Sequence, residues 1–335
     1  MLVVHPGALG DVLLALPALR AIRLAFPSHE LTLLTSRDVA GLLHTCGEVD
    51  RGVALEGPFL SDLLSGAQAV SPDWRAWLTR CRCVVGWLQD PDGALRNTLS
   101  RLGVRRVVLA SPVEAGPQAG HQAARYLAVL GDLARSGAPE TPMRLSEQDN
   151  GTVSAARLRL RPDGWMGPVA MVHPGSGSVH KCVKPKLLAA LVERLRQDGI
   201  LPLLLVGPAD ARQAEAVLAA CSQRPLVLDS LDLQALAGVL AQVDLFVGHD
   251  SGVTHLAAWL GRPVVALFGP TDAGCWSPQG PHVRVLTGER CRCDGWDQIR
   301  ACVDKPCLPV SLDSLLGACR LVRSQAPSSS PSSFP

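Results

Sequence analysis

The chain has 335 residues, of which 47% are hydrophobic and 19% charged, and its formal net charge is +2. This length suits two domains of ordinary size, and the apolar content is sufficient for two buried sheets. A net charge so close to zero argues against a dedicated nucleic-acid binder, which normally carries a strongly basic stripe.

The first residues predict no signal peptide. The apolar run MLVV is short, and Pro6, Gly7, Gly10 and Asp11 interrupt the segment after it. No apolar run reaches the roughly 18 residues that a membrane-spanning helix needs. We therefore expect a cytoplasmic protein whose 11 cysteines are mostly reduced thiols.

Strand and helix patterns alternate through the first half. Apolar, β-branched runs predict strands at 2–5, 30–35, 52–55, 83–87 and 105–110. Helical periodicity predicts helices at 11–26, 38–46, 74–82 and 121–133. Pro17 should kink the first helix or mark its true first turn. Pro and Gly content predicts loops at 111–120 and 137–142.

The same alternation restarts after a polar, then Arg-rich segment at 146–163, where we expect the linker between domains. Strands are predicted at 169–173, 201–207, 225–229, 244–250 and 263–269, and helices at 185–198, 209–221, 233–241 and 254–260. Alternating units of this kind imply parallel sheets with right-handed crossovers. We therefore predict domains at 1–155 and 156–323, followed by a disordered Ser/Pro-rich tail at 324–335.

One junction occurs in each half in nearly the same form. The residues from Val4 to Gly7 and from Val172 to Gly175 both read VHPG, each after an apolar strand and before a loop. Ligands of such folds bind where strand carboxyl ends open into loops. Two related domains with facing sites would suit the joining of two substrates.

The first junction continues to Gly10 and Asp11 at the predicted helix start. Glycines here permit a tight turn and close approach of a ligand to backbone amides. A dinucleotide fingerprint is excluded, because the third glycine is missing and no well-placed acid ends the second strand. Asp11 is therefore either a helix cap or a carboxylate held as a general base.

The second junction continues as GSGSVHK and ends on Lys181. Small residues expose backbone donors and a lysine supplies a compact charge, a combination suited to a diphosphate. The P-loop spacing is absent. Three of the four lysines in the chain lie at 181, 184 and 186. The alternative is a mobile surface loop with solvated lysines.

The run GHDSGVTH at 248–255 joins a predicted strand to a predicted helix, so the amides of 251–254 lie at a helix N-terminus. Such an end is a ready anion site. His255 could donate to a phosphate and Asp250 could accept from hydroxyls. A lone Asp or His here would be a cap, but the whole run predicts a ligand site. The loop at 268–272 is a weaker signal of a segment that closes over a ligand.

Several of these segments together resemble glycosyltransferase family nine, the heptosyltransferases of the lipopolysaccharide inner core. They are GALGDVLLALPALRAIRLAFP, HPGSGSVHK, LLVGPAD and VGHDSGVTHLAAWLGRPVVALFGPTD, and they span nearly the whole chain in order. The resemblance implies an α/β GT-B fold, two Rossmann-like domains with parallel sheets facing across a cleft. It places the nucleotide-sugar donor, ADP-heptose, on the C-terminal domain and a lipopolysaccharide core acceptor on the N-terminal domain.

The resemblance also implies residue roles. Asp11 matches the general base of an inverting displacement, and Lys181 matches the lysine that neutralises the leaving diphosphate. The implied donor-binding residues are Gly175, Ser176, Gly177, Asp250, Ser251, Gly252, Val253, Thr254 and His255, and those on the acceptor side are His5 and Gly10. A lysine and a helix N-terminus can stabilise a leaving phosphate. We therefore expect no metal and no cofactor.

Two departures from the family bear on these roles. The tryptophan–proline pair usual after the lysine is replaced by CVKP at 182–185, and an acid usual after Asp210 is replaced by Ala211. The second change leaves the choice of nucleobase open. An acceptor of this kind implies peripheral contact with the inner face of the inner membrane. We expect a monomer and no nucleic-acid partner.

Other possibilities remain open. A GT-B epimerase would want an additional acid and a histidine, and a non-catalytic nucleotide-sugar binding protein would have no use for Asp11. Cysteines at 291, 293, 302 and 307 could bind zinc, but their spacing is uncommon for zinc, and we favour packed or paired structural cysteines. Trp74, Trp77 and Trp87 are either sugar-stacking platforms or ordinary core or surface residues.

Overall fold

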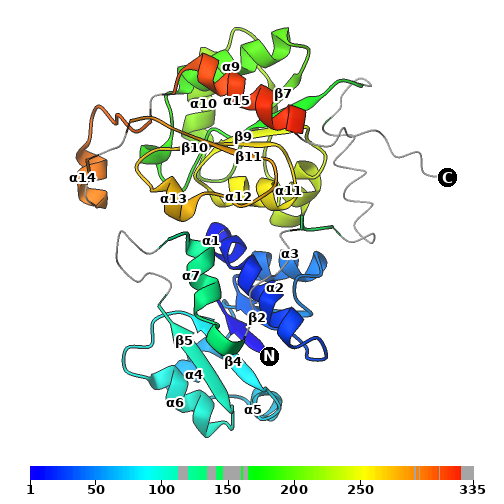
Figure 1. Cartoon of the computed structure of the whole chain (residues 1–335), viewed down its shortest axis with the longest axis vertical. Helices are drawn as coiled ribbons and strands as arrows, with labels where there is room; N and C mark the ends of the chain where they lie inside the picture. The colour runs from blue at the N-terminus through cyan, green and yellow to red at the C-terminus, as the bar shows by residue number, and fades with distance from the viewer. Residues whose placement is uncertain are drawn as a thin grey trace, which may run out of the picture. The chain divides into compact units, whose positions relative to one another are not determined.

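The computed structural model describes residues 1–111, 120–133, 141–145, 160, 165–289, 292–293, 295–308 and 310–325. The chain divides into two compact units, Met1–Glu140 and Thr141–Pro335, each built on one sheet (Figure 1). The boundary predicted at 155/156 lies outside the described residues. So do most of both predicted loops and the tail beyond residue 325.

The first unit contains a five-stranded parallel sheet in the order β3-β2-β1-β4-β5. Its strands are β1 (Leu2–Val4), β2 (Thr32–Thr35), β3 (Arg51–Ala54), β4 (Cys83–Trp87) and β5 (Arg106–Ala110). The strand order reverses between β1 and β4, and open α/β sheets bind ligands at this switch point.

Helices cover both faces of this first sheet. They are α1 (Leu9–Leu14), α2 (Leu16–Ala25), α3 (Arg37–Thr45), α4 (Phe59–Ser65), α5 (Pro72–Leu78), α6 (Ala94–Arg101) and α7 (Gln122–Ala128). Leu2, Val4 and Leu34 pack against α4 and α6 in one buried cluster. Helices α1, α2 and α7 pack on one another.

Pro17 divides the single helix predicted at 11–26. The structure has two helices there, and Pro17 lies in the first turn of α2. A proline is tolerated at this position because its missing N–H would have no helical partner in any case. This confirms the prediction that Pro17 kinks the helix or marks a first turn.

The second unit contains a six-stranded parallel sheet in the order β11-β10-β9-β6-β7-β8. Its strands are β6 (Val169–Val172), β7 (Leu201–Leu205), β8 (Leu226–Leu228), β9 (Leu245–His249), β10 (Val264–Phe268) and β11 (Val283–Thr287). In chain order this is the doubly wound arrangement of dinucleotide-binding folds, with its switch point between β6 and β9.

The helices of the second unit are α9 (Pro185–Gln197), α10 (Ala211–Ala220), α11 (Leu233–Leu240), α12 (Gly252–Trp259), α13 (Ala273–Trp276), α14 (Trp296–Ala301) and α15 (Leu312–Gln325). Helices α9 and α15 lie side by side over one face of the sheet (Figure 1). Val172, Val247 and Val265 point into this apolar layer. Helix α12 packs on β9 and β10 and against α11.

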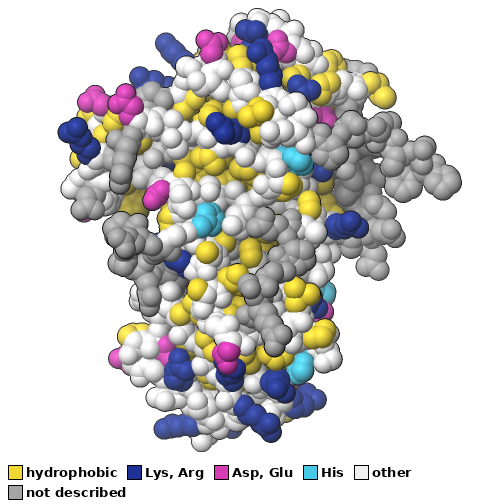
Figure 2. All heavy atoms as spheres, viewed as in Figure 1, with side chains coloured by type: hydrophobic (Ala, Val, Ile, Leu, Met, Phe, Trp, Pro, Cys, Tyr) yellow, Lys and Arg dark blue, Asp and Glu magenta, His cyan; other side chains and the backbone are white. Residues whose placement is uncertain are grey.

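The surface of the first unit carries a group of arginines near α5 and α6 (Figure 2). Its exposed members are Arg80 after α5, Arg82 before β4, Arg101 at the end of α6 and Arg105 before β5. They therefore lie at the amino edge of this sheet. None of the described helices is long and apolar enough to cross a membrane.

Candidate active site

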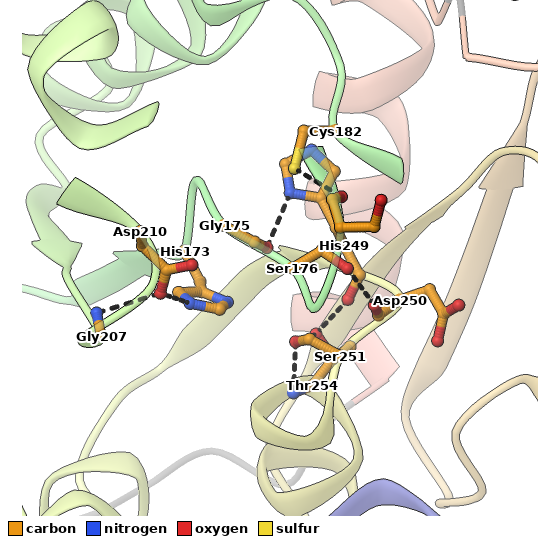
Figure 3. Close-up of polar contacts among 11 residues, drawn as sticks. His173, Gly175, Ser176, Cys182, Gly207, Asp210, His249, Asp250, Ser251 and Thr254 are labelled. Atoms are coloured by element: carbon orange, nitrogen blue, oxygen red, sulfur yellow. Dashed lines mark hydrogen bonds and ion pairs between the residues drawn. The ribbon is translucent and has the colours of Figure 1, made fainter. Parts of the chain in front are cut away.

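Two loops of the second unit meet where β6 and β9 end. The first runs from His173 to a 3₁₀ turn at Val179–Lys181, and the second is the short connection from β9 to α12. The hydroxyl of Ser176 donates to the carbonyl oxygen of Asp250 at 2.6 Å and joins the two loops (Figure 3). The topology therefore brings together two motifs that lie about 70 residues apart in the sequence.

Asp250 is the centre of the polar contacts at this edge. Its Oδ2 accepts from Lys181 Nζ at 2.7 Å and from the Thr271 hydroxyl at 2.7 Å. The Lys181 and Asp250 side chains are only 18% and 10% exposed. The carboxylate thus fixes the lysine in place, and Thr271 contributes the loop after β10.

His249 hydrogen-bonds to the loop that runs from His173 to Lys181, here called the lysine loop, and to Val183 just after it. Its Nδ1 donates to the Gly175 carbonyl at 3.2 Å, and its Nε2 accepts from the Val183 amide at 3.0 Å. Both nitrogens are satisfied in one neutral tautomer. Burial, and then the nearby His173, lower the pKa of His249 to about 4, so the ring stays neutral.

Asp210 lies directly over Gly175. A Cβ on Gly175 would lie 1.6 Å from Asp210 Oδ1, so any side chain at this position would require Asp210 to move. Asp210 Oδ2 binds His173 Nε2 at 2.8 Å and accepts from the Gly207 amide at 3.0 Å (Figure 3). Burial alone would raise the pKa of Asp210, but the hydrogen bond and charge of His173 outweigh it, and the pKa is lowered.

The start of α12 provides backbone donors. The Ser251 hydroxyl accepts from the Thr254 amide at 3.4 Å and caps the helix. Within the described residues, the amides of Gly252 and Val253 donate to no protein acceptor. These amides and the helix dipole favour an anion. His255, expected as a phosphate donor, is 3% exposed and buried in the first turn.

In the first unit, β1 leads through the loop 5–8 into α1. Asp11 is the third residue of α1, and its Oδ2 accepts from the Ala8 amide at 3.3 Å. The cap considered from the sequence is therefore a first-turn contact rather than an N-cap. Gly10 precedes Asp11 in the same turn. A Cβ on Gly7 would lie 2.7 Å from His5 Cε1 and 2.8 Å from Asp11 Cβ, so Gly7 separates the two side chains.

His5 lies beneath this loop. It is 1% exposed and packs against Trp87 and Tyr126, with ring centroids 5.5 and 5.1 Å away. Its Nδ1 accepts from the Gly7 amide at 3.1 Å. Burial lowers the pKa of His5 to about 4, so it is neutral and supports the loop that carries Asp11.

The tryptophans considered as sugar platforms are packed in the first unit. Trp87 is buried, and Trp74 stacks on Phe59 with ring centroids 4.0 Å apart. Trp77 meets Trp74 edge-on. Trp87 is therefore a core residue, and Trp74 and Trp77 are half-buried residues packed against the core of the first unit.

The cysteines of the C-terminal segment divide between core and loop. Cys307 and Cys319, the latter on α15 itself, lie in the buried cluster that includes residues of α9 and α15. Cys291 lies outside the described residues. Among the residues that the structure describes, no three His, Cys, Asp or Glu side chains form a group that could hold a metal ion.

The geometry thus groups Gly175, Ser176, Lys181, Asp250 and the start of α12 in the second unit, and His5, Gly10 and Asp11 in the first. Gly177 is in the lysine loop, where a Cβ would meet open space. The structure adds contacts that the sequence did not predict, from His173, Asp210, His249 and Thr271. Thr271 could have been found, because β10 neighbours β9 in the expected fold.

Two doubly wound parallel-sheet domains give this chain the GT-B fold. A model of the family "Glycosyltransferase family 9 (heptosyltransferase)" matches residues 110–295. The chain belongs to this family and is a glycosyltransferase.

Similar proteins agree with this assignment. The chain is 23% identical over 294 residues to "Lipopolysaccharide heptosyltransferase 3" of Escherichia coli K12, covering 80% of this chain and 82% of that protein. A family 9 glycosyl transferase from Veillonella parvula matches with a TM-score of 0.76 at 18% identity over 97% of both chains. The ADP-heptose lps heptosyltransferase II of E. coli matches with a TM-score of 0.74 at 18% identity over 97% of this chain and 98% of the other. At 18% identity, these two solved structures show that their fold is the same as that of this chain.

Proposed function

We propose that this glycosyltransferase moves heptose from ADP-heptose onto a lipopolysaccharide core acceptor with inversion at the anomeric carbon. The observation that carries the proposal is the cluster formed by Lys181, Asp250 and Thr271 beside the open amides of α12. Family membership and the names of the relatives supply the sugar and the acceptor.

The second unit would hold the donor. Negative charge builds on the leaving diphosphate as its bond to the sugar breaks, and the Lys181 ammonium with the amides of Gly252 and Val253 would stabilise that charge. Asp250 keeps Lys181 in position through their 2.7 Å contact. The Asp250 carboxylate and the Thr271 hydroxyl are the polar groups available to sugar hydroxyls.

The first unit would hold the acceptor. Asp11 would take the proton from the acceptor hydroxyl as that oxygen attacks the anomeric carbon from the face opposite the diphosphate. The new carbon–oxygen bond forms as the bond to the diphosphate breaks, and ADP leaves. One in-line step inverts the centre and needs no covalent intermediate on the protein.

We also propose that the enzyme acts as a cytoplasmic monomer and meets the membrane through its acceptor. The arginines at the amino edge of the first sheet lie at the opposite edge from Asp11, which follows the carboxyl end of β1. They are therefore not the surface that would hold a membrane-bound acceptor against this carboxylate.

Replacing Asp11 tests the mechanism. Asp11→Asn keeps the size of the side chain but removes the base, so we expect kcat to fall by about 10²- to 10⁴-fold while ADP affinity stays unchanged. Transfer is measured by mass spectrometry of the acceptor, and ADP binding by calorimetry. Asp38→Asn is the matched control, because Asp38 is an exposed first-turn aspartate of α3 in the same unit.

Each part of the proposal has an outcome that contradicts it. Full transfer by Asp11→Asn would remove Asp11 from the reaction. A thermal-shift screen against ADP-, UDP-, GDP- and CDP-sugars tests the donor, and a preference for another nucleotide would make ADP-heptose wrong. Retention of the anomeric configuration, read from proton couplings in the product, would exclude a single displacement.

A further inference from the structure

The fourth lysine of the chain contacts the turn that carries Lys181. Lys305 is in the segment that follows α14, far along the sequence from the lysines at 181, 184 and 186. Its Nζ lies 2.9 Å from Nδ1 of His180, the residue before Lys181 in the 3₁₀ turn. The C-terminal segment thus brings a second ammonium group to the lysine loop.

The contact fixes the state of the imidazole. An ammonium group has only donors, so His180 Nδ1 must accept, and the ring proton sits on Nε2. An imidazole carries no negative charge, so this contact does not offset the charge of Lys305. The half-buried pair therefore offers one positive charge and one ring N–H donor beside Lys181.

The two ammonium groups differ in their partners. Lys181 is paired with the carboxylate of Asp250 at 2.7 Å. Lys305 has no carboxylate partner among the residues that the structure describes. A nucleotide-sugar carries one negative charge on each phosphate, and the Lys181–Asp250 pair is neutral as a whole. Lys305 is therefore a positive charge beside Lys181 that no carboxylate of the described residues offsets.

The pKa of the neighbouring Cys182 thiol is influenced by both lysine charges. Burial, and then the Asp210 carboxylate, raise the pKa of Cys182 to about 11, while Lys305 and Lys181 act in the opposite direction. Both ammonium groups are therefore close enough to Cys182 to influence the same atom.

A second residue of the same segment reaches Lys181 itself. The Trp296 ring centroid lies 5.6 Å from Lys181 Nζ, and this side chain is 42% exposed. Residues from both ends of 296–305 thus contact two successive residues of the 3₁₀ turn, His180 and Lys181. The segment 296–305 therefore contacts the turn that carries Lys181 at two points.

From these contacts we infer that Lys305 is a second cation for the diphosphate of the nucleotide-sugar, held in place by His180. This inference rests on the proposed function, which gives the lysine loop its diphosphate ligand. Because Asp250 offsets the positive charge of Lys181, Lys305 supplies an additional positive charge. This charge stabilises the diphosphate further as ADP leaves.

The experiment measures nucleotide binding to the full chain by calorimetry. Lys305→Gln keeps an N–H donor for His180 but removes the charge, whereas Lys305→Arg keeps the charge. We expect Lys305→Gln to weaken ADP binding by about tenfold or more, in line with loss of one charge-assisted contact, and Lys305→Arg to retain most of the affinity. The affinity of Lys305→Gln for AMP, which lacks the second phosphate, should fall much less.

Control variants distinguish a role of Lys305 in diphosphate binding from a purely structural contact with His180. Lys186→Gln makes the same chemical change at an exposed lysine of α9 and should bind ADP as the wild type does. GDP and UDP carry the same diphosphate, so they repeat the comparison should the nucleobase differ from adenine. A melting temperature for each variant shows whether the fold is kept.

The outcomes are distinguishable. Wild-type affinity for nucleoside diphosphates in Lys305→Gln, with affinity lost in Lys181→Gln, overturns the role of Lys305 and leaves the proposed donor site standing. No binding of any nucleoside diphosphate by the wild-type chain overturns both. Equal loss of ADP and AMP affinity in Lys305→Gln makes Lys305 a structural tie and also overturns the inference.

Discussion

The two copies of the VHPG junction differ in what their histidines bind. His5 accepts a hydrogen bond from Gly7, two residues on, and holds the loop before Asp11. His173 instead binds the carboxylate of Asp210, which comes from the loop after β7. The same four residues therefore support their loops through different partners, because in the second unit Asp210 faces the junction and binds its histidine.

Buried neutral histidines make stability depend on pH. His5 and His249 each have a pKa near 4 in the folded chain, against 6.5 for an ordinary histidine. Between these values only the unfolded chain takes up the proton, so a falling pH favours unfolding. The stability from each histidine is full above about pH 6.5 and is lost as the pH falls to about 4. The pKa difference corresponds to about 3 kcal/mol for each group.

Urea unfolding at pH 7 and pH 5 measures this loss. His5→Asn keeps an acceptor for the Gly7 amide but cannot titrate, so its stability should fall less between the two pH values than that of the wild type. His44→Asn is the control, since His44 is exposed in α3, and should behave as the wild type. An equal pH dependence in all three proteins would contradict the assignment for His5.

At the scale of elements, the β9–α12 junction is the most tightly built part of the candidate site. The Thr254 hydroxyl donates to the His249 carbonyl at the end of β9 and lies 3.1 Å from the Ser251 hydroxyl that caps α12. A Cβ on Gly248 would lie 2.9 Å from the Thr254 hydroxyl, so the strand must carry a glycine there. The direction of α12, and with it the open amides, is set by these buried contacts.

Thr254→Val tests this junction. Valine has the shape of threonine but leaves the buried His249 carbonyl without its donor, which should cost about 1–3 kcal/mol in the free energy of unfolding. Thr254→Ser keeps the hydroxyl and should lose less. The free energies come from urea denaturation, and equal values for the two variants would show that the hydroxyl does not stabilise the helix start.

At the scale of the whole molecule, two units of the same winding carry different candidate roles. Each has its own buried cluster and its own switch point. The first unit places Asp11 after β1, and the second places Lys181 after β6, the equivalent strand. The proposed acceptor and donor roles therefore fall on equivalent positions of two sheets.

Hydrogen exchange measured by mass spectrometry checks this division. ADP should slow exchange mainly in the lysine loop, at 175–181, and at the start of α12, because the ligand would accept from amides there. The loop at 5–11 in the first unit should change little with ADP alone. Protection concentrated on 5–11 would place the nucleotide on the wrong unit.

Much of the fold followed from sequence pattern. The central strands of both sheets are runs of branched apolar residues bounded by glycine or proline, and each was predicted within a few residues. The elements that were not predicted are helices α4, α6, α13, α14 and α15 and strand β11. All of these helices except α15 have eight residues or fewer, which show little more than two helical turns, and β11 is half exposed. Helix α15 continues to Gln325, two residues into the tail predicted from residue 324.

The candidate site was predictable only where it follows strand ends. Motifs after β6 and β9 were expected to meet because parallel strands end at one edge. The contact of Lys305 with His180 joins residues 125 positions apart, and both lie outside regular strands. No periodicity links two such positions, so only the folded chain shows them together.

The overlap of Asp210 with the space above Gly175 also constrains how this family member can vary. A side chain at position 175 would meet the Asp210 carboxylate at 1.6 Å, so an alanine cannot appear there while the aspartate stays in place. An alanine fits at 175 if residue 210 is replaced by a shorter residue first, because the obstacle is then gone. An alanine at 175 therefore requires the Asp210 side chain to move or to be replaced by a smaller one.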